Sequence, residues 1–137
     1  MTAPRYGIRR VLKSATFADA VTAAVAALKK EGFGVLCEID LAATLKEKID
    51  VDMPRQLILA ACNPQLAYQA LQGEPDIGLL LPCNVVVREL EPNSIAVSAI
   101  DPRAVFGLVD NPGIEGIAAD VEKRLRTALE SIADGNG

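Results

Sequence analysis

Two short cysteine motifs are the part of this sequence best suited to chemistry. Cys62 opens the tripeptide CNP at 62–64, and Cys83 is the centre of the mirrored tripeptide PCN at 82–84. We predict that the first motif closes one strand and that the second opens the next. If these strands are antiparallel neighbours, both thiols lie near one end of the sheet. Directly opposed residues have Cβ atoms about 4.5–5.5 Å apart, which suits a two-thiolate metal site or a reversible disulfide.

An asparagine follows each of the two cysteines. Asn63 and Asn84 would add polar groups beside the thiols, and Cys62 directly precedes a predicted helix, whose N-terminus lowers the pKa of a thiol. The alternative is that the cysteines only pack, because free cysteine is a small hydrophobe and an asparagine before proline is first of all a helix cap. Both interpretations stay open for the pair, whereas Cys37, in mid-strand, is expected in the core.

Glu38 is a carboxylate in the middle of a short apolar strand. If its face of the sheet is covered, the residue needs a partner, and it would be a metal ligand or a general base with a raised pKa. The alternative is a solvated face, which Asp40, two residues further on, supports.

The composition excludes several classes of site. The chain has no histidine, so one chain holds no Ser-His-Asp or Cys-His catalytic set and no histidine-based zinc site. No glycine-rich phosphate loop is present. This absence of a convergent acid–base set favours binding over catalysis, although it leaves an enzyme open.

Charge and hydropathy bear on partners and location. The net charge is −4 with no basic stripe, which argues against nucleic acid as a partner. No apolar stretch is long enough to span a membrane or resembles a signal peptide. We therefore expect a cytoplasmic protein whose three cysteines stay reduced.

The hydrophobic pattern predicts one α+β domain over residues 1–137, with 134–137 as a frayed tail. Expected strands cover 6–13, 33–39, 56–62, 84–90 and 94–100. Expected helices begin near 17, 41, 64, 102 and 112, and 73–82 is irregular. Alternation in the second strand places Val35, Cys37 and Ile39 on one face.

These elements predict a single, mainly antiparallel sheet with its helices largely on one face. The second face of the sheet then needs cover, which a partner subunit could supply.

Five stretches together resemble the family called domain of unknown function 302: GFGVLCEID (32–40), ATLKEKI (43–49), ILAACNPQLAYQAL (58–71), IGLLLPCNVVVREL (77–90) and AIDP (99–102). The chain resembles a cysteine-bearing branch, since other members tend to have Gly-Asn-Pro at the CNP position. Some members carry a histidine where this chain has Leu41. The resemblance implies a fold similar to the TATA-box-binding-protein half-domain, without DNA binding, and a homodimer. It implies no activity.

Three hypotheses follow. The first is a small dimeric binding protein in which Cys62 and Cys83 form a site for an unidentified small ligand or for a soft metal ion. The ion would be Cu(I), or Zn²⁺ completed by Glu38 or a second subunit. The second is a thiol-redox or sulfur-handling enzyme or carrier, with Cys62 as nucleophile and Cys83 as resolving thiol. The third is a structural dimer module in which the cysteines only pack.

Overall fold

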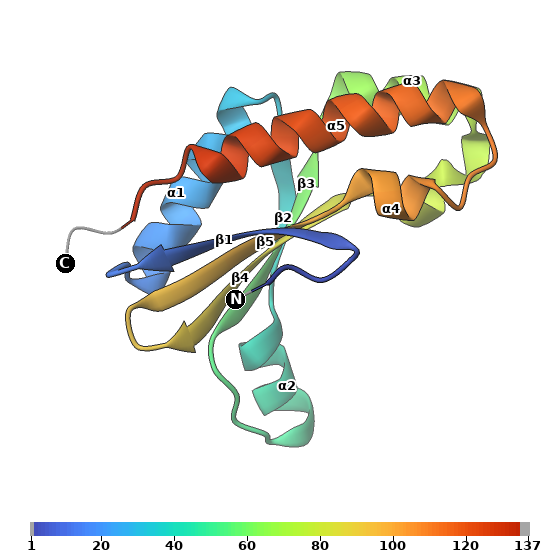
Figure 1. Cartoon of the computed structure of the whole chain (residues 1–137). Helices are drawn as coiled ribbons and strands as arrows, with labels where there is room; N and C mark the ends of the chain where they lie inside the picture. The colour runs from blue at the N-terminus through green and yellow to red at the C-terminus, as the bar shows by residue number, and fades with distance from the viewer. Residues whose placement is uncertain (1, 135–137) are drawn as a thin grey trace.

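The computed structural model describes residues 2–134 and contains a five-stranded antiparallel sheet with α1 and α5 on one face (Figure 1). The strands are β1 (Gly7–Lys13), β2 (Gly34–Asp40), β3 (Gln56–Cys62), β4 (Cys83–Glu91) and β5 (Ser94–Ile100). They lie in the order β1-β5-β4-β3-β2, so β1 and β2 occupy opposite edges. The predicted α+β class and the antiparallel sheet are confirmed.

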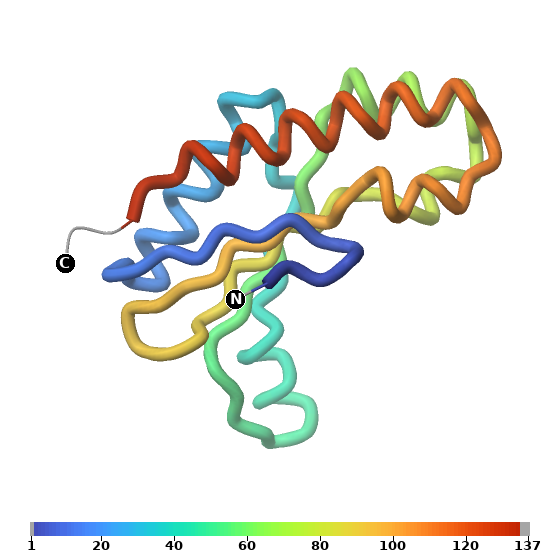
Figure 2. The backbone as a smooth tube through the Cα atoms, viewed as in Figure 1, coloured from blue at the N-terminus to red at the C-terminus, as the bar shows by residue number. Residues whose placement is uncertain are grey.

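The helices are α1 (Phe17–Lys30), α2 (Leu41–Ile49), α3 (Pro64–Gly73), α4 (Pro102–Phe106) and α5 (Pro112–Glu130). The segment predicted as irregular contains a 3₁₀ helix, η1 (Pro75–Leu80). Helices α3 and α4 and the start of α5 extend beyond the ends of the strands (Figure 2). No helix in residues 2–134 has the length and apolar composition needed to cross a membrane.

Local capping explains where the helices begin. The Thr16 hydroxyl accepts a hydrogen bond from the backbone N–H of Asp19 at 3.2 Å and so caps α1. Asp40 caps α2 in the same way, through the N–H of Ala43 at 3.0 Å. Because Asp40 also ends β2, one side chain terminates the strand and starts the helix.

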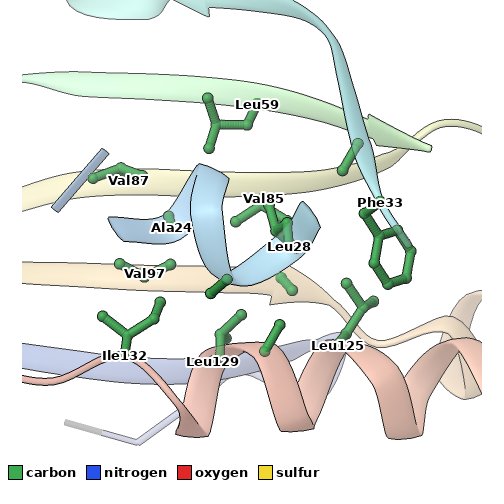
Figure 3. Packing of buried hydrophobic residues seen from close by; sticks show 14 of the residues in the cluster. Ala24, Leu28, Phe33, Leu59, Val85, Val87, Val97, Leu125, Leu129 and Ile132 are labelled. Atoms are coloured by element: carbon green, nitrogen blue, oxygen red, sulfur yellow. The ribbon is translucent and has the colours of Figure 1, made fainter. Parts of the chain in front are cut away.

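The main hydrophobic core lies between the sheet and helices α1 and α5 (Figure 3). Alternate residues of the three inner strands point toward the helices and are buried: Leu59, Ala61, Cys83, Val85, Val87, Ile95, Val97 and Ala99. A second, smaller cluster joins α3, η1, α4 and the start of α5: Ala70, Ile77, Phe106, Ile114 and Ala118. The chain therefore has two adjoining apolar regions beside one sheet.

The alternation predicted for β2 is wrong, because the strand contains a bulge. Val35 pairs with Ala61, but Cys37 pairs with Ala60, so Leu36 is an extra residue between them. Directly opposed residues share a face, which places Val35 on the helix side and Cys37 on the open side. The expectation that Cys37 belongs to the core is also wrong, since its side chain is exposed on this edge strand.

Asp134, the first residue of the predicted tail, contacts β1. Its carboxylate accepts a hydrogen bond from the backbone N–H of Lys13 at 3.0 Å and lies 3.9 Å from the Arg10 guanidinium. The frayed tail stays a prediction. The rest of the predicted tail, 135–137, lies outside the described residues.

Candidate functional site

Cys62 and Cys83 lie on neighbouring antiparallel strands, at the same end of the sheet. Cys62 is the last residue of β3 and Cys83 the first of β4. The residue directly opposite Cys83 is Ala61, and Cys62 is paired with Gly34 on the other side. The two cysteines are thus offset by one residue: Ala61 shares the helix-side face with Cys83, so the strand alternation places Cys62 toward the opposite face, at the point where the chain turns into α3.

Both cysteines nevertheless line one small pocket beyond the strand ends. The pocket has a volume of about 20 Å³, which is enough for one water-sized occupant. It lies where the two hydrophobic clusters meet, and its walls come from both of them. The lining residues are Phe33, Ala61, Cys62, Asn63, Leu66, Ala67, Ala70, Leu81, Pro82, Cys83, Phe106, Ile117 and Val121.

The two thiols differ in their surroundings. Cys83 is 7% exposed and Cys62 is half-buried. Burial, and secondarily the charge of Cys62, raises the pKa of the Cys83 thiol to about 11. Cys83 is therefore a neutral thiol at pH 7, and any chemistry that uses its thiolate must first remove a proton from a buried group.

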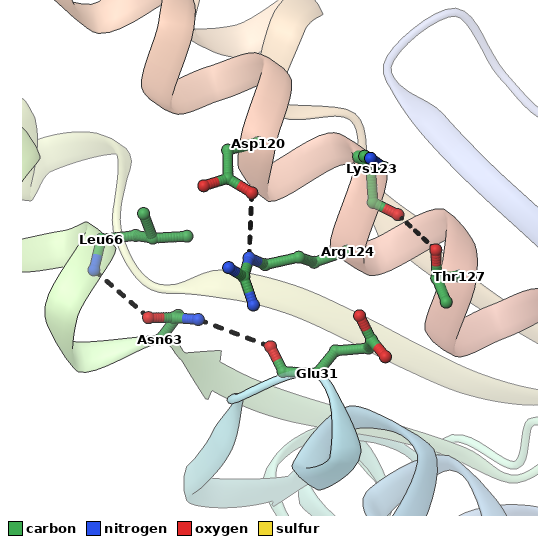
Figure 4. Close-up of polar contacts among 7 residues, drawn as sticks. All are labelled: Glu31, Asn63, Leu66, Asp120, Lys123, Arg124 and Thr127. Carbon is green, nitrogen blue, oxygen red and sulfur yellow. Dashed lines mark hydrogen bonds and ion pairs between the residues drawn. The ribbon is translucent and has the colours of Figure 1, made fainter.

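Asn63 fixes the backbone around the pocket mouth by two hydrogen bonds (Figure 4). Its side-chain oxygen accepts from the backbone N–H of Leu66 at 3.2 Å, which caps α3 as predicted. Its amide nitrogen donates to the carbonyl of Glu31 at 3.5 Å. Asn63 thereby ties the start of α3 to the end of α1.

Gly32 permits that close approach. Its φ is +86°, a conformation that favours glycine. A Cβ at this position would lie 2.9 Å from the Asn63 amide nitrogen. Gly32 follows the end of α1 and also leaves room for the Asn63 side chain.

Glu38 and Asn84 do not join the thiols. Glu38 is exposed and pairs with Leu59, which is three residues, or about 10 Å, along β3 from Cys62. The solvated-face interpretation of Glu38 fits this position. Asn84 follows Cys83 on a regular strand, so its side chain points to the opposite, open face of the sheet, where it lines a separate groove.

Sequence reasoning missed the apolar walls of the pocket. Phe33, Phe106 and Val121 reach it from three distant segments. Their hydrophobic periodicity marks them as buried, but only the packing of α4 and α5 over the strand ends brings them to the cysteines.

Comparisons with known proteins agree with this fold. Residues 9–132 match the family described as "Domain of unknown function DUF302". The chain belongs to the DUF302 family. It is also similar to the crystal structure of an uncharacterized conserved DUF302 protein from Bacillus stearothermophilus, with 30% sequence identity and a TM-score of 0.86. That alignment covers 94% of this chain and 99% of the other. No curated protein matches the sequence.

The DUF302 assignment confirms the resemblance read from the sequence motifs and supports the α+β fold. Neither the family description nor the description of the crystal structure gives an activity. The features of this chain that bear on function are therefore those of its own pocket around Cys62 and Cys83.

Proposed function

We propose that this DUF302 protein binds a soft monovalent ion, Cu(I), between the thiolates of Cys62 and Cys83. The observation that supports the proposal is that Cys62 and Cys83 are both among the residues that line one pocket of single-ion size. Thiolate ligands select soft ions such as Cu(I), and a d¹⁰ monovalent ion accepts two sulfur ligands. A tetrahedral zinc site would need four ligands, and the Glu38 side chain proposed to complete it lies elsewhere.

The pocket walls favour an ion held by few ligands. Apart from the Asn63 amide, the side chains that line the pocket with the two cysteines are apolar, so they offer no hard oxygen or nitrogen ligand to compete with the sulfurs. Binding replaces the proton of each thiol by the metal, and the formation of the metal–sulfur bonds offsets the cost of making a buried thiolate. Because Cys83 has a pKa of about 11, its proton is released on binding at neutral pH. Affinity should accordingly rise about tenfold per pH unit for this proton.

The test is native mass spectrometry of the freshly reduced protein with Cu(I), supplied from a competing chelator. The parent chain should take up one copper per chain. Cys62→Ser and Cys83→Ser should take up none, because one thiolate remains in each. Cys37→Ser is the matched control and should bind like the parent, since Cys37 is exposed on β2.

Two results would count against the ion site. If Cys83→Ser kept stoichiometric copper, the ion would be held without the buried thiol. If the parent took up no copper but formed a Cys62–Cys83 disulfide with mild oxidant, the thiol-redox hypothesis would replace this one. In that hypothesis Cys83 is the resolving thiol, and its pKa argues against this role, because only about 10⁻⁴ of the Cys83 thiol is ionised at pH 7.

We further propose that the protein is a cytoplasmic homodimer, in keeping with the reduced thiols that the ion site requires. The support for a dimer is the edge strand β2, whose Leu36 and Ile39 side chains are 66% and 44% exposed. An unpaired edge with exposed apolar residues is a template for pairing with a second chain, and a two-fold contact makes such an edge self-complementary.

A further inference from the structure

A groove on the open face of the sheet is lined by two arginines. Its volume is about 470 Å³, within the usual range of about 300–1,000 Å³ for small-molecule sites. Of the described residues that line it, two are arginines, Arg9 and Arg88, and none is an aspartate or glutamate. This is unexpected in a chain with 18 acidic and 14 basic residues. The charge of the groove therefore differs in sign from that of the whole chain.

The strand register places the two arginines on either side of β5. Arg9 on β1 is opposite Ser98, and Arg88 on β4 is opposite Ala96. Ser98 and Ala96 are consecutive residues on the open face of β5, and both are small. Long cationic side chains on the flanking strands therefore border a space above the central strand. Glu91, an acidic residue of β4 on this face, pairs with Ser94 at the far end of the hairpin and does not line the groove.

Arg9 is held in one orientation. Its Nε donates to the Ser98 hydroxyl at 3.0 Å, and its Nη1 donates to the carbonyl of Thr2 at 3.1 Å. Within residues 2–134 its Nη2 has no hydrogen-bond partner. A guanidinium that is already fixed loses less entropy when it binds a planar oxyanion, which it does best by two parallel hydrogen bonds.

The remaining lining supplies a neutral polar rim and an apolar floor. Tyr6, Gln56 and Asn84 contribute hydroxyl and amide groups, while Val86 and Ile100 contribute apolar surface. A few directed polar groups over an apolar floor are typical of small-molecule sites. Asn84 lines this groove and not the pocket that contains Cys62 and Cys83.

We propose that this groove binds a small organic oxyanion, a carboxylate or a phosphate monoester with a short apolar body. Arg9 holds the anionic group, Arg88 neutralises it from the opposite side, and the apolar floor takes the body of the ligand. The site is independent of the thiol pocket, because Cys83 and Asn84 point to opposite faces of β4.

A second copy of the chain does not fit this groove. A two-fold contact across it would bring arginine against arginine, and like charges at an interface are unfavourable. The dimer proposed through β2 leaves the groove open, since β2 and β1 are opposite edges of the sheet.

The test uses ¹⁵N-labelled, reduced and metal-free full-length protein titrated with benzoate, phenyl phosphate and benzyl alcohol. The amide signals of Arg9, Arg88 and Ser98 should shift saturably with at least one of the anions and not with the neutral alcohol. Comparing benzoate with phenyl phosphate shows which oxyanion the groove prefers. Arg9→Gln should weaken binding about tenfold, because it removes a charge-assisted hydrogen-bond donor.

Three further variants separate the site from general charge effects. Arg9→Lys keeps the positive charge but loses the parallel N–H donors of the guanidinium, and it should bind the anion more weakly than the parent. Ser98→Ala keeps both arginines and frees Nε, and it should weaken binding by a smaller factor. Lys48→Gln, on exposed α2, should bind like the parent. The proposal fails if no anion gives saturable shifts, if benzyl alcohol shifts the same amides, or if Arg9→Gln and Lys48→Gln bind alike.

Discussion

At the start of β4, burial changes the chemistry of one thiol more than any neighbouring charge does. Removing Cys83 from water disfavours its ionised form, and the nearby Cys62 adds to this effect. The neutral thiol packs with the core residues around it, so the same side chain belongs both to the core and to the proposed ion site. Its proton is therefore linked to folding as well as to metal binding.

This linkage predicts a decrease in stability at alkaline pH. The pKa of Cys83 is about 11 in the folded chain against an ordinary value of 9.0. Below pH 9 the Cys83 thiol is protonated in both the folded and the unfolded chain, so its full contribution to the free energy of unfolding is present. As pH rises from 9 to 11 the unfolded chain loses the proton first, so stability falls, by roughly 2–3 kcal/mol in total.

Urea unfolding of the reduced, metal-free protein between pH 7 and 11 would measure this decrease, and Cys83→Ala provides the comparison. The variant should be less stable than the parent at pH 7, but its stability should fall less steeply above pH 9. Parallel pH profiles for the two proteins would show that Cys83 does not carry the effect.

At the scale of elements, the bulge in β2 decides which side chains reach the open face. Leu36 has no partner residue in the ladder with β3, while the residues on either side pair with Ala61 and Ala60. The bulge lets Val35 join the core and leaves Cys37 and Ile39 on the open side. Because of the extra residue Leu36, the side chains of Val35 and Cys37 point to opposite faces of the sheet, whereas in a regular strand they would share one face.

Deleting Leu36 should consequently preserve the fold. The remaining residues already have the alternation of a regular strand, so Val35 and Cys37 keep their partners. We expect the free energy of unfolding to change by about 1 kcal/mol or less, as for other exposed positions, and Cys37 to stay reactive to maleimide. Deletion of Ile58 is the contrasting variant: β3 is paired on both sides, and a register error there should unfold the protein. Unfolding on deletion of Leu36 would contradict this account of the strand.

Most element positions could be predicted because each has a local cause. Proline follows Asn63, Asp101 and Asn111, and each of these three caps begins a helix in the structure. The bulge, the strand order and the edge position of β2 have no local signal, since they depend on which strands pair. For the same reason the motifs located both cysteines at strand ends but could not give their offset, which the register with Ala61 decides.

The open-face groove could not be predicted from the sequence either, because it forms only when particular strands pair. Arg9 and Arg88 are far apart in the sequence, and neither stands out in a chain with 14 basic residues. Only the placement of β5 between β1 and β4 brings them to one surface. Charge that is distributed evenly in the sequence can therefore be concentrated by strand order.

At the scale of the whole molecule, the edge strand gives a prediction about assembly. Ile39→Lys puts a charge on the β2 edge and should convert the proposed homodimer to a monomer, because an edge lysine opposes pairing with a second chain. Leu108→Lys is the matched control: Leu108 is 80% exposed but lies just after α4, away from β2. Light scattering coupled to size exclusion would measure both masses. A parent that is monomeric, or a dimer that Ile39→Lys leaves intact, would rule out this interface.

The place of β5 in the sheet has a consequence for the chain as it is synthesised. β1 emerges from the ribosome first, yet its partner is β5, so its hydrogen bonds wait until residue 100 has left the exit tunnel. The β2–β3 pair can form much earlier, but α5, which covers the same core, is translated last. A nascent chain stalled before β5 would leave the apolar side of β1 without its sheet partner, and synthesis of β5 and α5 would bury that surface in a late step.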